Sequence, residues 1–504
     1  MRRWTSISVA CRASTSGSRD SVRSGTRWRS LTASPCRSTS RLPPARCCTS
    51  CAPSTPRCRG SWRSADHPRT GSGGDLPRKS ETTTCVIAGG GPAGIMLGLL
   101  LARAGVEVTV LEKHADFLRD FRGDTVHAST IRLLDELGLG EGFRQLPQSK
   151  LGNFRFPTSN GDTVLVGDFD TLKPPYNYIA MVPQWDLLNF LVAAAELEPT
   201  FTLRMNTEAT GLLFGDGNDD GGRVAGVSYL TRDAASGEPV GTGQLRALLT
   251  VACDGRDSVL RQKAGLFPRE FAVPFDTWWF RVSRNKEEQE QIATLVPRFS
   301  GDEVLLALTR KDYYQIAYIA RKGLDATLRA EGVESFRRRI GRLRPDLADR
   351  LGEIASMDDL HMLDVKLNRL GTWHKPGLLL IGDAAHAMSP AGGVGINLAI
   401  QDAVAAAARI ARPLLDGSLS EAHLASVQKR RWFPTVVLQS GQRLLQKAIF
   451  EPAITGKRAG APRSALFVAS HVPLLRRVPA RMIAFGPRPE HAPDFARRQP
   501  DRAG

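Results

Sequence analysis

One glycine-rich segment near residue 90 constrains the fold of this 504-residue chain more than any other feature. A short β-rich apolar run, Cys85–Ala88, leads into the sequence GGGPAG at residues 89–94, and a helix pattern rich in Ala and Leu follows as far as Gly105. A second strand is then predicted over Val106–Leu111. Strand, glycine turn, helix and strand make a βαβ unit, which predicts an α/β domain with a doubly wound parallel sheet.

The glycine spacing in this unit is that of a dinucleotide-binding turn. Gly89 permits the tight turn, Gly91 lets the backbone approach a pyrophosphate, and Gly94 lets the helix pack closely on the strand. The start of the helix then offers free N–H groups and the positive end of its dipole to phosphates. Glu112 ends the second strand, where a carboxylate accepts hydrogen bonds from ribose hydroxyls. Because this acid disfavours a 2′-phosphate, the site suits FAD or NAD better than NADP.

Two later segments also place Gly and Asp directly after an apolar strand. Asp254-Gly255 follows LLTVAC, and Gly382-Asp383 follows LLLI. The second of these leads through a glycine-rich loop to a helix that is predicted to begin at about Val394. Since the carboxyl ends of parallel strands lie at one edge of a sheet, we expect the three junctions to converge there, where ligands bind.

The positive charge of the chain is concentrated before its folded part. Residues 1–80 carry fifteen Arg and one Lys against three Asp, so they hold 13 of the 17 net positive charges. This Arg/Ser-rich extension has no hydrophobic periodicity and is expected to be disordered, either as the product of a mis-set start, which we favour, or as an organellar leader. The distribution argues against nucleic acid as a partner of the folded part.

Cysteine usage is skewed in the same way. Six of the eight cysteines lie in the extension, and Cys85 and Cys253 have no paired spacing, which predicts a reduced, cytoplasmic protein without a metal site. The sequence RCCTSC at residues 46–51 is a weak zinc candidate, because it lacks a second spaced ligand pair. No run of eighteen apolar residues occurs, so no membrane span is expected.

The three ordered motifs together resemble the FAD-dependent aromatic monooxygenases of the p-hydroxybenzoate hydroxylase class, the group A flavoprotein monooxygenases. They are GxGxxG at residues 89–94, Asp254-Gly255, and GDAAHAMSPAGGVGIN at residues 382–397. The resemblance covers about residues 83–415 and implies bound FAD, NAD(P)H as reductant and O2 as co-substrate. It implies hydroxylation of an aromatic substrate, whether phenolic, quinone-precursor or polyketide-like, through a flavin hydroperoxide.

The resemblance also implies roles for particular residues. Glu112 would bind the adenosine ribose, Arg122 and Gln184 would line the FAD cleft, and Asp254 would help to hold both FAD and NAD(P)H. Asp383 would bind the ribityl hydroxyls of FAD. The backbone N–H groups of residues 393–397 would face the flavin ring, and Pro390 would fix the loop beside its edge. The full set of expected cofactor-binding residues is Gly89, Gly91, Ala93, Gly94, Glu112, Lys113, Arg122, Gln184, Asp254, Gly255, Gly382, Asp383, Pro390, Gly392, Gly393, Gly395, Ile396 and Asn397.

The β-rich insertions predict a Rossmann-like FAD-binding domain with an interleaved β-rich substrate domain and a C-terminal helical segment, helical to the chain end. The expected boundaries are 81–150, 181–265 and 361–415 for the FAD-binding domain, 151–180 and 266–360 for the substrate domain, and 416–504 for the C-terminal helices.

No side chain is assigned to proton transfer from the sequence. His386 is interpreted as a structural residue with satisfied hydrogen bonds rather than a base. In the substrate domain, alternation places Trp278 and Phe280 on one strand face and Trp279 and Arg281 on the other, and Tyr314, Ile316 and Tyr318 share a face opposite Tyr313, Gln315 and Ala317. One of these faces is expected to be core and the other to cover the flavin, and the pattern leaves open which is which.

Two other functions remain open from the residues alone. The first is an FAD-dependent reductase or dehydrogenase that acts on prenyl or ring carbons without O2. The second is a non-enzymatic basic protein that binds nucleic acid or a membrane surface. The sequence HVPLLRRVPARMIAF at residues 471–485 is basic and apolar enough to touch a membrane, but ordinary helix packing is favoured for it, so at most a peripheral membrane contact is expected. Flavin halogenation is disfavoured because no WxWxIP sequence occurs. A monomer or a homodimer is expected.

Overall fold

The computed structural model describes residues 78–118, 125–157, 163–215, 222–289, 295–456 and 473–498. Residues 73–504 form one compact unit. The extension predicted to be disordered lies outside the described residues, except that the first strand begins at Arg78 rather than near Thr83. The added residues are held because Arg78 to Thr83 pair in parallel with Thr242 to Ala247 of a long neighbouring strand.

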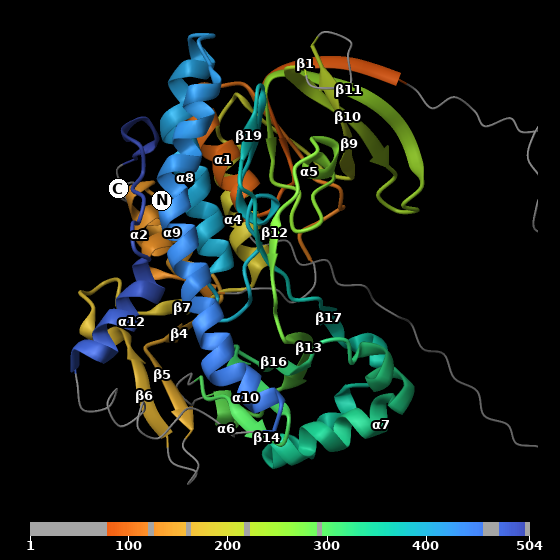
Figure 1. Ribbon diagram of the computed structural model, residues 1–504, viewed down its shortest axis with the longest axis vertical. Helices are drawn as coiled ribbons and strands as arrows, with labels where there is room; N and C mark the ends of the chain where they lie inside the picture. The colour runs from red at the N-terminus through yellow and green to blue at the C-terminus, as the bar shows by residue number, and fades with distance from the viewer. Residues whose placement is uncertain are drawn as a thin grey trace, which may run out of the picture. The chain divides into compact units, whose positions relative to one another are not determined.

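The largest sheet has eight strands and contains the predicted parallel core. Its order is β19-β20-β11-β1-β2-β8, and β10 and β9 continue it from β11. Strands β20, β11, β1, β2 and β8 run parallel, which confirms the doubly wound α/β expectation (Figure 1). The bounds are β1 Arg78–Ala88, β2 Val108–Leu111, β8 Phe201–Arg204, β9 Thr207–Phe214, β10 Val224–Arg232, β11 Pro239–Ala252, β19 His374–Lys375 and β20 Leu378–Leu380.

Alternating residues of β1 contribute to two cores, one on each face of this sheet. Cys85 and Ile87 join a cluster with helices α1, α4 and α8, whereas Val86 and Ala88 join residues of β10 and β11 and Trp373. These helices are long and almost wholly apolar toward the sheet, as the sequence pattern predicts. Their bounds are α1 Pro92–Arg103, α4 Gln184–Ala195 and α8 Gly395–Leu415.

The second large sheet is antiparallel, with the order β14-β15-β16-β13-β17. Its face with Trp278, Phe280 and Tyr318 packs against Phe336 and Ile340 of α7 and is therefore core. The opposite face, with Trp279 and Ala317, belongs to a different cluster that includes Met181. The bounds are β13 Phe275–Ser283, β14 Arg298–Ser300, β15 Glu303–Thr309, β16 Tyr313–Arg321, β17 His361–Leu363 and α7 Asp325–Leu343.

Short elements connect these two sheets. The pair β12–β18 is antiparallel, β3-β7-β4 form a three-stranded sheet, and β5–β6 form a hairpin. The strands are β3 Thr125–Val126, β4 Ser149–Leu151, β5 Asn153–Pro157, β6 Thr163–Asp168, β7 Ile179–Met181, β12 Arg269–Phe271 and β18 Leu367–Arg369. The short helices are α2 Ala128–Glu136, α3 Gly140–Gln145, α5 Val259–Lys263 and α6 Lys286–Gln289.

The C-terminal part is helical over α9 Glu421–Leu445, α10 Glu451–Ile454 and α12 Pro473–Phe485. The expectation of helix to the chain end is wrong for residues 486–498, which carry only one 3-10 turn, at Asp494–Ala496. Three prolines, Pro487, Pro489 and Pro493, explain the difference, because proline removes helix N–H donors and clashes with the preceding turn. The division of the compact unit into FAD-binding, substrate and C-terminal parts stays a prediction.

In the part of the chain that the structure describes, no helix combines the length and the apolar character needed to cross a membrane.

Candidate functional site

The three strand-to-turn junctions meet at the carboxyl edge of the parallel sheet, as the sequence predicts. The Cys253 N–H donates to the Ala88 carbonyl at 2.7 Å, and the Ile381 N–H donates to the Ala252 carbonyl at 3.2 Å. Gly89, with φ of +105°, lies so close to the middle junction that a Cβ would come within 2.3 Å of the Cys253 carbonyl oxygen. The residues after β1, β11 and β20 therefore form one continuous site.

The glycine turn after β1 leaves the start of helix α1 open. A Cβ at Gly94 would lie 2.0 Å from the Gly89 carbonyl oxygen, so only glycine permits this packing of helix on turn. Gly91 precedes the first residue of α1, no side chain caps the helix, and nothing lies within 4 Å of where a Gly91 Cβ would be. The N–H groups of the first helical turn therefore have no capping side chain, as a diphosphate site requires.

Glu112 is buried beside this turn. Its Oε2 accepts a hydrogen bond from the Gly90 N–H at 2.8 Å, and its Oε1 lies 3.0 Å from the His114 N–H and 2.8 Å from its Nδ1. The carboxylate therefore fixes the glycine turn to the end of β2 in addition to any contact with a ribose. The contact with His114 was not foreseen from the sequence. Lys113, an expected site residue, is exposed next to Glu112.

Asp254 holds the turn after β11. Its carboxylate accepts hydrogen bonds from the Ser258 hydroxyl at 2.5 Å and from the Leu260 N–H at 3.1 Å, and burial raises its pKa. Gly255 has φ of +86°, and no atom lies within 4 Å of where its Cβ would be. The backbone of this turn is consequently accessible.

Two arginines from the same segment link this turn to the Gly382-Asp383 junction. Arg256 Nε lies 3.8 Å from Asp383 Oδ2, and Arg261 donates to the Ala384 carbonyl at 3.0 Å. Neither arginine was predicted from the sequence. They follow Asp254 by two and seven residues. This spacing indicates a contact with the Gly382-Asp383 turn only once the two junctions are known to be neighbours.

A buried charge network supports the loop after β20. Asp402 of α8 accepts a hydrogen bond from the Gly382 N–H at 3.1 Å, lies 2.6 Å from His386 Nε2, and pairs with Arg431 Nε at 2.8 Å. Burial raises the pKa of Asp402, but His386, Arg431 and their hydrogen bonds outweigh it, so the pKa lies below its usual range. Arg431 continues the network to Glu490 at 3.3 Å. His386 is thereby placed in the core, but the expectation of satisfied hydrogen bonds is met only at Nε2, because its buried Nδ1 has no hydrogen-bond partner among the described residues.

The glycine-rich loop leads into the amino end of α8. Gly392 and Gly393 have positive φ, and a Cβ at Gly393 would lie 2.2 Å from the Thr125 hydroxyl. The Gly393 N–H donates to the Pro390 carbonyl at 3.0 Å. Gly395 and Ile396 begin α8, so their N–H groups belong to the unsatisfied first turn.

The Asn397 side chain serves the protein rather than the open site. Its oxygen accepts hydrogen bonds from the His127 N–H and the Thr130 hydroxyl, each at 2.8 Å, and its nitrogen donates to the Thr125 carbonyl at 2.9 Å. These bonds clamp α8 to the start of α2. Only the backbone N–H of Asn397 remains for a cofactor.

The other two expected residues lie on different segments. Arg122 lies outside the described residues. Gln184 begins α4, and the adjacent Trp185 ring lies 5.4 Å from the Arg281 guanidinium of β13. The start of α4 therefore meets the Trp279 face of the antiparallel sheet, which settles which face is turned toward the nucleotide-binding part.

The arrangement fits FAD. An open helix start suits a diphosphate, a carboxylate ends the neighbouring strand, and a second helix start can carry negative charge on a flavin ring. The site offers backbone N–H donors, carboxylate acceptors and an amide, and no group of three or more His, Cys, Asp or Glu within the described ranges could hold a metal ion.

Comparison with known proteins gives one consistent result. A family described as "FAD binding domain" matches residues 81–440. A 6-methylpretetramide 4-monooxygenase of Streptomyces rimosus is 34% identical over 83% of this chain and 95% of its own length. An anhydrotetracycline monooxygenase of the same species is 31% identical over 63% of this chain and 60% of its own. The crystal structure of an anhydrotetracycline hydroxylase from Streptomyces rimosus, at 24% identity, superposes with a TM-score of 0.60 over 80% of this chain and 76% of its own.

Proposed function

This chain belongs to the family of FAD-dependent aromatic monooxygenases, and we propose that its substrate is an oxygen-rich polycyclic ring of the aromatic polyketide type. The enzyme takes electrons from NAD(P)H and uses O2 to hydroxylate an aromatic compound. The relatives at 34% and 31% identity are named for tetracycline precursors, which are fused rings with several oxygen substituents. The expectation of a purely nucleic-acid or membrane-binding protein is set aside.

We propose that different residues at the sheet edge bind different parts of FAD. The start of α1, from Gly91 to Gly94, would bind the diphosphate, and Glu112 would bind the adenosine ribose. Asp383, half-exposed and beside Arg256, would bind the ribityl chain. FAD bound there supplies the reducible ring that passes electrons from NAD(P)H to O2.

The start of α8 would act on the charge of the flavin. Gly395 and Ile396 present unsatisfied N–H groups and the positive end of a 21-residue helix. A reduced flavin carries negative charge, so this helix end would stabilise it. The loop before α8 would be held in place by Asp402, His386 and Arg431, which would not touch the cofactor.

The observation that carries the substrate proposal is a set of unpaired polar groups on one sheet face. Thr277 Oγ1, Trp279 Nε1 and Gln315 Nε2 are buried and have no hydrogen-bond partner in the structure as described. The register places them on the same face of β13 and β16. An unpaired buried polar group costs about 1–3 kcal/mol, so a substrate that paired with these three groups would be stabilised by them.

The orientation of Gln315 shows what this ligand must offer. Its Oε1 accepts two hydrogen bonds from Arg310, at 3.1 and 2.7 Å, and arginine can only donate. The amide NH2 group therefore points away from Arg310 and needs an acceptor. With the indole N–H of Trp279, the face offers N–H donors to oxygen atoms of the substrate. A ring with several hydroxyl or carbonyl oxygens meets this requirement.

We further propose a cytoplasmic monomer or homodimer. The two cysteines of the described part, Cys85 and Cys253, are free thiols, which is typical of a reducing compartment. Sedimentation of the FAD-loaded protein tests the oligomeric state, and a stable higher assembly would contradict it.

The substrate proposal is tested by the stimulation of NAD(P)H oxidation. Purified enzyme loaded with FAD is supplied with O2 and with either anhydrotetracycline or 4-nitrophenol, and peroxide release is measured in parallel. Strong stimulation with little peroxide is expected for anhydrotetracycline and weak, uncoupled oxidation for 4-nitrophenol. The reverse order would overturn the polycyclic assignment. Turnover of the substrate under anaerobic conditions would point instead to a dehydrogenase.

A further inference from the structure

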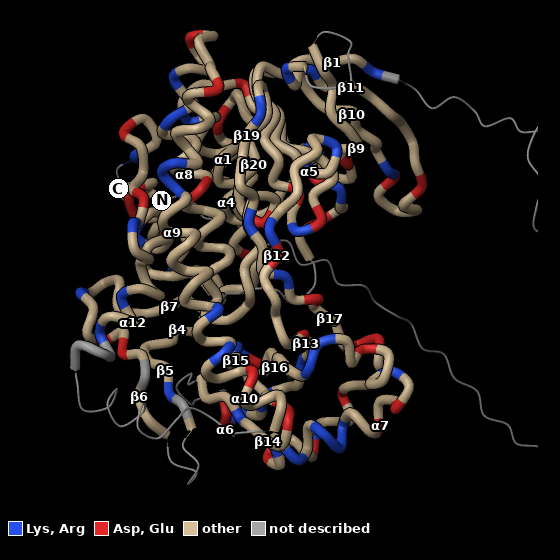
Figure 2. The backbone as a smooth tube through the Cα atoms, in the orientation of Figure 1, with Lys and Arg blue, Asp and Glu red and all other residues tan. Residues whose placement is uncertain are grey.

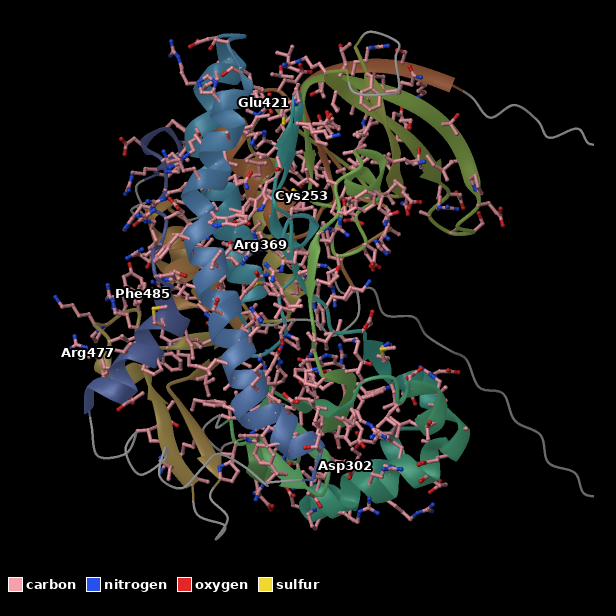
Figure 3. All side chains as sticks on the ribbon, in the orientation of Figure 1. Cys253, Asp302, Arg369, Glu421, Arg477 and Phe485 are labelled. Carbon is pink, nitrogen blue, oxygen red and sulfur yellow. The ribbon has the colours of Figure 1, made fainter. Side chains whose placement is uncertain are left out.

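Arginines gather around one aromatic ring on the strand pair β12–β18. The guanidinium groups of Arg269, Arg369 and Arg443 lie 5.4, 5.6 and 4.8 Å from the centre of the Phe271 ring. Arg269 and Arg369 are direct cross-strand partners, and Arg443 approaches from α9. Figure 2 shows Lys and Arg along this part of the backbone, and Figure 3 labels Arg369 between α9 and β12.

This cluster of Arg269, Arg369 and Arg443, called here the Phe271 arginine cluster, has no acidic counterpart. Among the described residues, no carboxylate forms an ion pair with any of the three. The nearest acid in sequence, Glu270, lies on the opposite face of β12 and accepts a hydrogen bond from Asn368. Burial and then the charges of Arg269 and Arg443 lower the pKa of Arg369. The groups therefore repel one another.

Such an arrangement is costly unless an anion joins it. Like charges directly opposite each other on an antiparallel pair are destabilising. Arg369 is nevertheless held firmly, because it donates to Gln439 at 2.9 Å and lies 4.7 Å from the Trp432 ring. Arg369 is held in place and Arg269 and Arg443 are exposed, and three guanidinium groups without a carboxylate are suited to phosphate, which they can bind through charge-assisted, bidentate hydrogen bonds.

The cluster lies next to the loop of the flavin site. On either side of Arg369, the Asn368 and Leu370 N–H groups donate to the Ala387 and Ala385 carbonyls, at 3.2 and 2.8 Å. The Ala387 N–H returns a bond to the Asn368 side chain at 3.1 Å. The loop that carries Asp383 and the strand that carries Arg369 are thus directly joined.

A groove of about 330 Å³ opens beside the cluster, with Phe271, Lys322 and Lys366 in its wall. The acids that share this wall are already paired: Asp364 with both lysines, and Glu270 with Asn368. A molecule whose phosphates reach the arginines has room to extend along this groove.

We propose that the Phe271 arginine cluster binds the phosphates of the pyridine nucleotide, and that the enzyme uses NADPH in preference to NADH. This inference rests on the proposed flavin site, whose single glycine turn after β1 is used by FAD and leaves the second nucleotide without one. NADPH differs from NADH by a 2′-phosphate, which brings up to two further negative charges. A site with three arginines and no free acid favours that group, whereas Glu112 disfavours it at the first site.

The test compares Arg369→Gln and Arg443→Gln with Arg412→Gln. Arg412 is an exposed arginine of α8 that pairs only with Asp416 among the described residues, so its variant is the matched control for loss of one positive charge. Two quantities are measured on the FAD-loaded full chain: the affinity for adenosine 2′,5′-bisphosphate by calorimetry, and flavin reduction by NADPH or NADH under anaerobic conditions. Neither requires the aromatic substrate.

Each cluster variant is expected to weaken binding of the bisphosphate and of NADPH about 10-fold or more, the loss of one charge-assisted hydrogen bond, with the limiting reduction rate unchanged. Arg412→Gln is expected to leave both unchanged, and wild-type enzyme is expected to bind NADPH more tightly than NADH. Changes within twofold in both cluster variants, with normal FAD content and thermal stability, would overturn the assignment. A wild-type protein that holds no FAD, or is reduced by neither nucleotide, would instead overturn the proposed function.

Discussion

Trp278 and Trp279 are consecutive residues of β13, and only one of their indole N–H groups has a hydrogen-bond partner among the described residues. The Trp278 Nε1–H donates to Asp325 at 2.7 Å in the core beneath α7, whereas the Trp279 Nε1–H has no partner among the described residues. At this scale the structure separates an indole N–H that is bonded within the core from one that the proposed substrate would use.

The two tryptophans predict opposite outcomes for the same substitution. Trp278→Phe removes a hydrogen bond to a carboxylate and should lower the free energy of unfolding by about 1.5–3 kcal/mol, with little effect on substrate affinity. Trp279→Phe removes no hydrogen bond of the protein, so it should lower stability less than Trp278→Phe does, and it should weaken substrate binding. Urea denaturation and a flavin-absorbance titration with anhydrotetracycline measure the two effects. Equal loss of stability in both variants would contradict the account.

Gly94 is a second position where a single added carbon atom is expected to change stability and FAD binding. Gly94→Ala would place a methyl group against the Gly89 carbonyl, so the turn or the helix must move. We expect a loss of about 1–3 kcal/mol in stability and a protein that no longer retains FAD during purification. Gly352→Ala is the control, because no atom lies within 4 Å of that position. Retention of FAD by Gly94→Ala would show that the turn is not part of the cofactor site.

At the scale of secondary-structure elements, α2 and α12 meet through one buried histidine. His127 precedes α2, and its Nδ1 lies 2.7 Å from the Ile483 carbonyl of α12, so this nitrogen carries the proton. Burial lowers its pKa to about 4. Because the pKa is lower in the folded than in the unfolded chain, the stabilisation is complete above pH 6.5 and is lost as the pH falls from there toward 4.

This junction makes stability depend on pH. Between pH 7 and pH 5 the free energy of unfolding should fall by about 2 kcal/mol from this group alone. His127→Asn keeps a donor for the Ile483 carbonyl and does not titrate, so its dependence on pH should be flatter by that amount. Identical slopes for wild type and His127→Asn in urea denaturation would refute this role.

Helices and strands that are marked by a pattern within their own residues could be predicted from the sequence. The elements that pack against them could not be predicted. The strand-glycine-helix unit at residues 85–104 and helix α4 follow from apolar spacing and glycine position within a few residues. The choice of the Trp279 face, by contrast, depends on what packs against each side of β13, and nothing in the alternation names that partner. The helix predicted for residues 486–498 does not form because of prolines, and these prolines could have been taken into account from the sequence.

At the scale of the whole molecule, the site is assembled from segments almost 300 residues apart. Gly89 touches Cys253, and Gly382 lies against Ala93 of α1 and Ala399 of α8. The order of motifs along the chain predicted this convergence, because parallel strands bring their carboxyl ends together. The contacts that support it, such as Arg431 with Asp402, depend on the docking of α9 and carry no local signature. The same holds for the Phe271 arginine cluster, which joins three separate elements.

The central claim is that this molecule inserts one atom of O2 into an aromatic ring. The most direct measurement is mass spectrometry of the product formed from anhydrotetracycline, NADPH and ¹⁸O2 by the FAD-loaded enzyme in ordinary water. We predict a product that carries one ¹⁸O atom and no label when ¹⁸O is supplied only in water. A product that takes its oxygen from water, or one that forms equally well without O2, would contradict the claim.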